Sequence, residues 1–139
     1  MPKAQLTVAQ NASPTDADLI AAARSVIKRR DLHKCHGGQV GAAILTVDGS
    51  LHLGVCLDAP CALGFCAETA AVAAMVTAGE SQIAATVAVA EDGSVLPPCG
   101  RCRELLALLD PANAEARILL SGGRATTLAA LMPESGANL

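Results

Sequence analysis

Apolar residues recur at helical spacing near the start of the chain. Five of them fall on one face of a helix: Leu19, Ile20, Ala23, Val26 and Ile27. The preceding stretch, Ser13-Pro14-Thr15-Asp16, supplies N-cap chemistry, so we predict a helix from there to about Arg30. The Lys28-Arg29-Arg30 cluster would lie in its last turn, where cations complement the helix dipole. A binding patch is the alternative interpretation of this cluster.

Shorter apolar runs follow, separated by turn signals. The runs Val40 to Val47 and Leu51 to Leu57 flank Asp48-Gly49, which is typical of a two-residue hairpin turn, so we predict an antiparallel pair. The later predicted elements are a helix from about Ala67 to Ala78, a strand from Ile83 to Ala90, a helix opened by Pro97-Pro98-Cys99-Gly100 and ending near Leu109, a strand from Ala116 to Leu120, and a short helix from Leu128 to Met132.

The alternation of these elements predicts the fold class. Continuously apolar strands joined through helices are typical of parallel pairing, with helices on both faces of the sheet. We therefore expect a three-layer α/β/α sandwich with a mixed sheet, in which an antiparallel hairpin is followed by parallel strands. The chain should form one domain over residues 1–139, with residues 1–13 loosely held.

The helix predicted at Ala67 to Ala78 has almost no charged face. A helix that is apolar all round is buried all round, and a small domain rarely encloses one completely. We therefore expect other subunits of a symmetric homo-oligomer to cover part of it. The core should consist of small side chains, because the chain has one Phe, no Trp and no Tyr.

Composition excludes several classes of protein. With 52% apolar and 17% charged residues the chain is not disordered, and a net charge of -3 without clustered cations or aromatics argues against nucleic-acid binding. The start of the chain lacks the apolar stretch of a signal peptide, and no apolar run is long enough to span a membrane. We therefore expect a cytoplasmic location. In a reducing compartment, six cysteines favour metal-binding, catalytic or buried thiols over disulfides.

Three of these cysteines have the spacing of a metal site. Cys99 and Cys102 are separated by two residues at a predicted helix start, and Cys66 stands at another. Helix N-termini favour thiolates, and three protein ligands leave a fourth position open, which is typical of catalytic zinc. Glu68 would reach that position only from the first helical turn, where it can move protons rather than bind metal.

Other interpretations of the cysteines remain open. Buried thiols with an accidental Cys-x-x-Cys spacing, or a thioredoxin-like redox pair at Cys99 and Cys102, would leave Glu68 unexplained. Cys56 and Cys61 would complete an iron-sulfur set, or they are pocket or core thiols. A second cluster, His33, Cys35 and His36, is either ordinary loop chemistry or, through His36, a contact to substrate.

The cysteine and glutamate pattern resembles the zinc-dependent cytidine deaminase family, in its short, all-cysteine, homotetrameric type. The resemblance covers Val40 to Pro133 and includes the Val40-Gly41-Ala42-Ala43 strand. It implies one Zn²⁺ per chain held by Cys66, Cys99 and Cys102, with Glu68 as the catalytic acid/base. The Pro-Cys-Gly-Arg-Cys-Arg string and Thr69 look particularly like blasticidin S deaminase.

The implied reaction is hydrolytic deamination in pyrimidine nucleoside salvage. Activated water attacks C4 of an aminopyrimidine while Glu68 delivers protons to N3 and to the departing amino group. Arg101 or Arg103 would offset the negative charge of three thiolates, with Arg103 outside the ligand shell. The substrate-binding residues implied are Cys56, Asp58, Phe65, Ala67 and Arg101.

The substrate contacts depart from the family pattern. The family often holds ribose with an Asn and a Glu spaced by one residue, and here Cys56-Leu57-Asp58 is the nearest match. Asp58 keeps a carboxylate, whereas Cys56 lacks an amide. Phe65 is the one aromatic ring, either lining the pocket or packed in the core. Two function classes therefore stay open: a deaminase of cytidine-like or blasticidin-type nucleosides, and a zinc-stabilised scaffold without activity.

Overall fold

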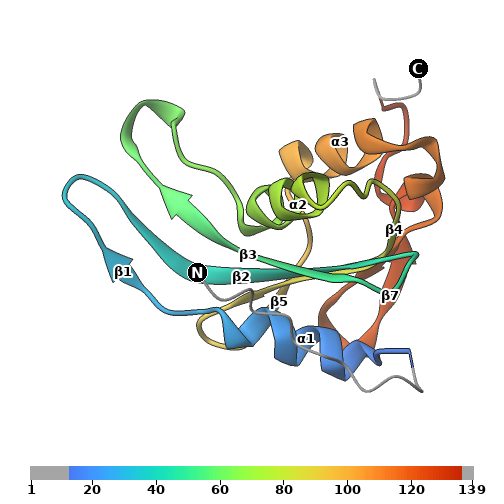
Figure 1. Ribbon diagram of the computed structural model, residues 1–139, viewed down its shortest axis with the longest axis horizontal. Coiled ribbons are helices and arrows are strands. Elements are labelled where there is room, and N and C mark those ends of the chain that lie inside the picture. Colours follow the sequence, from blue (N-terminus) through green and yellow to red (C-terminus); the bar gives the residue numbers. More distant parts are fainter. Residues whose placement is uncertain (1–12, 136–139) are drawn as a thin grey trace.

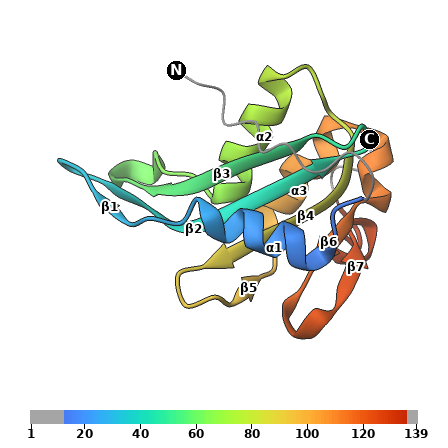
Figure 2. The same cartoon turned by 60° about the horizontal axis from the view of Figure 1, so that its bottom comes forward.

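The computed structural model describes residues 13–135, which form a mixed β-sheet with helices on both faces (Figures 1 and 2). The helices are α1 (Asp16–Ser25), α2 (Ala67–Thr77) and α3 (Gly100–Leu109), and the strands are β1 (Arg30–Asp31), β2 (His36–Thr46), β3 (Leu51–Asp58), β4 (Ile83–Ala90), β5 (Val95–Leu96), β6 (Arg117–Leu119) and β7 (Ala125–Thr127). Single 3-10 turns occur at Pro60–Ala62, Pro111–Glu115, Ser121–Gly123 and Ala129–Leu131. The predicted three-layer α/β class is confirmed; the prediction for residues 1–13 falls almost entirely outside the described residues.

The order of strands explains which of them run parallel. β2 pairs antiparallel with both β3 and β4, and β4 pairs parallel with β6. The connection through α2 makes β4 run in the same direction as β3. However, β4 pairs with β2 and not with β3, so this pairing is antiparallel. The predicted hairpin is therefore confirmed, whereas parallel pairing is confined to β4 and β6. The short strands β1, β5 and β7 were not predicted.

The first helix is shorter than its sequence pattern predicts. Thr15 is the N-cap, and it forms a reciprocal capping box with Asp18, but the helix ends at Ser25 instead of continuing to Arg30. Beyond it the N–H of Lys28 donates to the carbonyl of Gly38 at 2.9 Å, and Arg30 enters β1. The helix thus ends where the following residues begin to pair with β2. The basic cluster does not lie in a last helical turn, and that interpretation was wrong.

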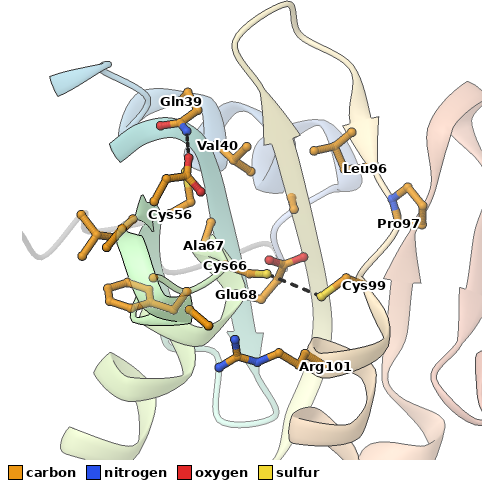
Figure 3. A pocket seen from close by; sticks show the side chains of 17 residues that line it. Gln39, Val40, Cys56, Cys66, Ala67, Glu68, Leu96, Pro97, Cys99 and Arg101 are labelled. Atoms are coloured by element: carbon orange, nitrogen blue, oxygen red, sulfur yellow. Dashed lines mark hydrogen bonds between the residues drawn. The ribbon is translucent and has the colours of Figure 1, made fainter. Parts of the chain in front are cut away.

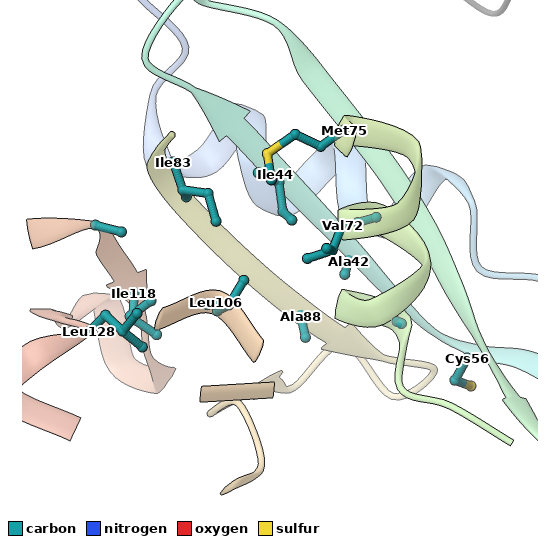
Figure 4. Packing of buried hydrophobic residues seen from close by; sticks show 13 residues of the cluster. Ala42, Ile44, Cys56, Val72, Met75, Ile83, Ala88, Leu106, Ile118 and Leu128 are labelled. Carbon is teal, nitrogen blue, oxygen red and sulfur yellow. The ribbon is translucent and has the colours of Figure 1, made fainter. Parts of the chain in front are cut away.

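Two cores of small aliphatic side chains fill the space on either side of the sheet. α1 covers one core, in which Leu19 and Ala23 pack on Val87 and Val89. α2 and α3 cover the other, which contains Ala42, Ile44, Val72, Met75 and Leu106 (Figure 4). Gly54 allows α2 to sit directly on β3, since a Cβ there would lie 2.4 Å from the backbone nitrogen of Ala71. The structure thus has the close backbone approach expected of an alanine-rich core.

One face of α2 is uncovered in the single chain. Ala67, Ala71, Val72 and Met75 face the core, while Ala73, Val76 and Thr77 are exposed. Over the described residues, none of the helices combines the length and apolarity needed to cross a bilayer.

Candidate metal centre and pocket

Two helix starts bring the predicted ligands together. Cys66 is the N-cap residue of α2 and Cys99 is the N-cap residue of α3, and neither side chain accepts a capping hydrogen bond. Cys102 follows one turn into α3 and is buried. The free N–H groups and positive dipole ends of two helices therefore surround three sulfur atoms.

The sulfur positions fit a zinc ion. The Sγ atoms of Cys66, Cys99 and Cys102 all lie within 4.8 Å of one another, and those of Cys66 and Cys99 are 3.5 Å apart. Tetrahedral zinc with bonds of about 2.3 Å places neighbouring sulfurs about 3.8 Å apart. Three thiols thus can hold the ion and leave a fourth position open. Within residues 13–135 this is the one such cluster, and neither Cys56, Cys61 nor the His33 to His36 segment joins it.

Burial changes the acidity of the thiols. Desolvation raises the pKa of Cys66 and of Cys102, and the Glu68 carboxylate raises both further. Burial also opposes ionisation of Cys99, but the backbone N–H of Cys102 and the neighbouring sulfurs outweigh it, and the net pKa is lowered. Three thiolates and a carboxylate repel one another, so a divalent cation is the group that allows all of them to ionise together.

Glu68 is the buried carboxylate of the site. It lies in the first turn of α2, as its spacing from Cys66 predicted, and only 6% of its surface is exposed. Desolvation raises its pKa above the ordinary value. It lines a cavity of about 460 Å³ together with Cys66 and Cys99. In Figure 3 these three side chains lie in the middle of the pocket, with Gln39 drawn at one end and Arg101 at the other.

The residues expected to contact substrate all line this cavity. They are Cys56, Asp58, Phe65, Ala67 and Arg101. Phe65 is 36% exposed and belongs to the pocket wall, where its backbone pairs with Leu57. Ala67 is fully buried at the start of α2. The placement of Phe65 decides between its two interpretations, because the ring is not enclosed in either core.

Arg103 lies outside the cavity wall and has a different environment from Arg101. Its Nε donates to the carbonyl of Pro98 at 2.8 Å, and a terminal nitrogen donates to the carbonyl of Leu131 at 3.2 Å. The guanidinium therefore ties the loop before Cys99 to the C-terminal 3-10 turn. This leaves Arg101 as the arginine that reaches the pocket.

Sequence reasoning missed Gln39, which also lines the cavity. Its Nε2 donates a hydrogen bond to Oδ2 of Asp58, and Nε2 of His36 lies 3.3 Å from the same oxygen. The glycine pair that precedes Gln39 in a strand pattern was the available signal, since glycine inside a strand often marks a bulge.

Comparison with known proteins identifies the family. The fold and the three-thiol cluster beside a carboxylate define an α/β protein with a site that can bind zinc. Residues 13–114 match the family described as "Cytidine and deoxycytidylate deaminase zinc-binding region". The chain belongs to this family.

Two curated relatives are cytidine deaminases by name. The chain is 40% identical over 76 residues to that of Halalkalibacterium halodurans, covering 54% of this chain and 58% of that protein. It is 43% identical over 68 residues to that of Mycobacterium tuberculosis, covering 48% and 51%. The matched segments thus span only about half of these curated relatives.

Solved structures match over a longer range. The crystal structure of cytidine deaminase from Mycobacterium tuberculosis has a TM-score of 0.73 at 30% identity, covering 88% of this chain and 98% of that chain. The enzyme from Burkholderia pseudomallei has a TM-score of 0.71 at 28% identity, covering 87% and 98%. The likeness therefore extends over nearly the whole described fold.

Proposed function

We propose that the protein catalyses the zinc-dependent hydrolytic deamination of a cytidine-like aminopyrimidine nucleoside, giving the uridine-type product and ammonia. The observation that carries this proposal is the buried carboxylate of Glu68, which lines one cavity with Cys66 and Cys99, two of the three clustered thiols. A purely structural zinc site needs no carboxylate beside an open ligand position. The named activity of the relatives points in the same direction.

In the proposed mechanism, Cys66, Cys99 and Cys102 hold one Zn²⁺. When bound, this ion supplies Lewis-acid activation of a water molecule. Glu68 accepts a proton from that water and donates it to N3 of the pyrimidine as the C4–O bond forms. It then carries the second proton to the amino nitrogen as the C4–N bond breaks. Glu68 must begin ionised to accept the first proton. Its burial raises its pKa, which favours retention of that proton until it is donated to the substrate.

The test of the reaction is an absorbance assay of the zinc-loaded protein on cytidine, deoxycytidine, cytosine and blasticidin S. We expect turnover of a nucleoside. Arg101 between Cys99 and Cys102 at the cavity wall favours the blasticidin-type antibiotic as the second candidate substrate. Turnover of none of the four by fully zinc-loaded protein would contradict the proposal and favour the inactive scaffold.

The role of Glu68 is tested by Glu68→Gln, which keeps the shape and removes the proton carrier. Loss of general acid/base catalysis should lower kcat by about 10²–10⁴-fold. Zinc content should stay at one ion per chain, because Glu68 is not a ligand. Glu91→Gln, at an exposed glutamate, is the matched control. Undiminished turnover in Glu68→Gln would remove this residue from the mechanism.

We also propose a homotetramer in the cytoplasm, serving pyrimidine nucleoside salvage. Support for assembly comes from the exposed, uncharged face of α2. Support for a reducing compartment comes from the six cysteines, all of which are free thiols.

A further inference from the structure

An irregularity in β2 determines the shape of the pocket at the end opposite Arg101. β2 and β3 are in register at Gly37 and Leu57, and again at Gly41 and Val55. Residues 38–40 of β2 therefore lie opposite the single residue Cys56 of β3. A bulge of this kind changes the direction of the side chains that it carries, and here Gln39 and Val40 line the cavity.

Glycines make this bulge possible. Gly38 has a φ of +83°, and a Cβ on it would lie 2.0 Å from the carbonyl oxygen of Lys28. A Cβ on Gly37 would lie 2.5 Å from the carbonyl oxygen of Cys56. No other residue type fits at either position without a backbone shift. The position of Gln39 beside the cavity thus depends on a backbone that these two glycines permit.

Gln39 and His36 both approach the same oxygen of Asp58. Gln39 Nε2 donates to Oδ2, and His36 Nε2 is 3.3 Å from that atom. Over the described residues no donor contacts the second oxygen, Oδ1. Asp58 lines the cavity and about half of its side chain is exposed, so its carboxylate is accessible to a ligand.

One polar atom of the Gln39 side chain is buried without a hydrogen bond. Its carbonyl oxygen, Oε1, is buried and has no hydrogen-bond partner among the described residues. An unpaired buried acceptor is unfavourable, so an apolar side chain of similar size would suit this wall better on packing grounds. The contact that accounts for the amide is its hydrogen bond to Asp58. This favours a role in function over a role in folding.

We propose that Gln39 is a positioning residue that determines specificity for nucleosides over free bases. It holds Oδ2 of Asp58 so that Oδ1 accepts a hydrogen bond from a sugar hydroxyl group, while the base lies at Glu68. The thiol of Cys56, in β3, forms only weak hydrogen bonds. The amide next to Asp58 is instead that of Gln39, which lies in the paired strand β2. This inference rests on the proposed deamination, and it adds which residue selects the sugar-bearing substrate.

The experiment compares cytidine with cytosine as substrates of the zinc-loaded wild type and of Gln39→Leu. Loss of the hydrogen bond from Gln39 to Asp58 should raise KM for cytidine about tenfold. It should leave kcat within about twofold, because the residues at the reacting atoms are unchanged. Any turnover of cytosine should be unchanged. Gln82→Leu is the matched control, since Gln82 donates to Asp110 in an amide–carboxylate pair outside the cavity.

Two further variants separate positioning from a general structural effect. Gln39→Glu keeps the shape but sets a carboxylate against Asp58, and it should raise KM for cytidine at least as much. In an Asp58→Ala background, Gln39→Leu should have no further effect, because the two residues act as one unit. Additive effects in this double-mutant cycle would overturn the inference.

The outcomes distinguish this inference from the proposed reaction. If the wild type deaminates cytidine and both Gln39 variants keep its KM, the positioning role is overturned and the reaction stands. Turnover of cytosine without cytidine also overturns it, because no sugar would be selected. If the wild type deaminates none of the four compounds, the proposed reaction itself is wrong.

Discussion

Cysteine occupies the N-cap position of both α2 and α3, where Ser, Thr, Asp or Asn would ordinarily accept a hydrogen bond from the backbone. Neither Cys66 nor Cys99 forms a capping hydrogen bond of that kind, so the N–H groups at both helix starts are left to interact with sulfur, as the N–H of Cys102 does with Cys99. Those groups stabilise thiolates, and thiolates bind the metal. Zinc neutralises the negative charge of the thiolates at the two helix starts. Zinc binding should therefore stabilise both helix starts, which links folding stability to metal affinity.

This linkage predicts the effect of removing one ligand. In Cys102→Ala, zinc affinity should fall by at least about 100-fold, beyond the roughly 10–100-fold cost of losing an outer-shell partner. The melting temperature should fall as well, because metal binding contributes to folding. Metal analysis after dialysis and thermal unfolding with and without chelator measure both effects. Cys61→Ala, at an exposed thiol outside the cluster, should change neither. Full zinc occupancy in Cys102→Ala would contradict the ligand assignment.

The individual residues of the site differed in how readily the sequence revealed them. Cys66, Cys99, Cys102 and Glu68 could be predicted because their spacing is local and each lies at a helix start. Gln39 could not, because its position depends on a bulge whose geometry is set by contacts of Gly38 with a distant carbonyl group. Local spacing carries no information about such contacts.

At the scale of secondary structure, the site depends on how α3 is anchored. Arg103 fixes the loop before Cys99, and Asn113 fixes the other end of the helix. The Asn113 side chain is fully buried; it accepts from the N–H of Ile83 at 2.8 Å and donates to the carbonyls of Ser81 and Leu106, each at 3.0 Å. One amide thus joins α3 to the start of β4.

Substitution of this amide should destabilise the protein. Asn113→Ala removes three hydrogen bonds and leaves a buried N–H group unpaired, so the free energy of unfolding should fall by about 2–4 kcal/mol. Urea denaturation measures the difference. Gln82→Ala, which removes one exposed hydrogen bond of 3.3 Å, should cost less than about 0.5 kcal/mol. Equal losses in the two variants would show that the buried network has no special role.

The elements themselves were predictable to different degrees. The boundaries of α2 and α3 followed from glycine, proline and apolar spacing, which act within a few residues. The end of α1 did not, because the backbone around Lys28 bonds to Gly38 of β2 rather than continuing the helix. The direction of pairing between β2 and β4 also escaped prediction. That direction depends on whether β4 pairs with β2 or with β3. Both of these strands are apolar, so their composition does not show which of them β4 joins.

For the whole molecule, the scarcity of aromatic residues has two consequences. The two cores consist of aliphatic side chains and close backbone contacts, and the single ring, Phe65, is at the pocket instead of inside a core. α2 lies in an outer layer and buries one face against the sheet, so its other face is outside. That face is uncharged and includes Val76, of which 51% is exposed. It is the surface on which the proposed homotetramer would associate.

Assembly is tested by placing a charge on this face. The wild type should have a mass in solution of about four times the 13.9 kDa of one chain, measured by light scattering after size exclusion. Val76→Glu would bury a carboxylate in the interface, and it should shift the mass toward one or two chains. Val47→Glu is the matched control, because Val47 is similarly exposed, at 56%, but lies in the turn between β2 and β3. The dissociated variant should still bind zinc, since all three thiols come from one chain. A monomeric wild type, or a tetramer that tolerates Val76→Glu as well as Val47→Glu, would mean that α2 is not the contact surface.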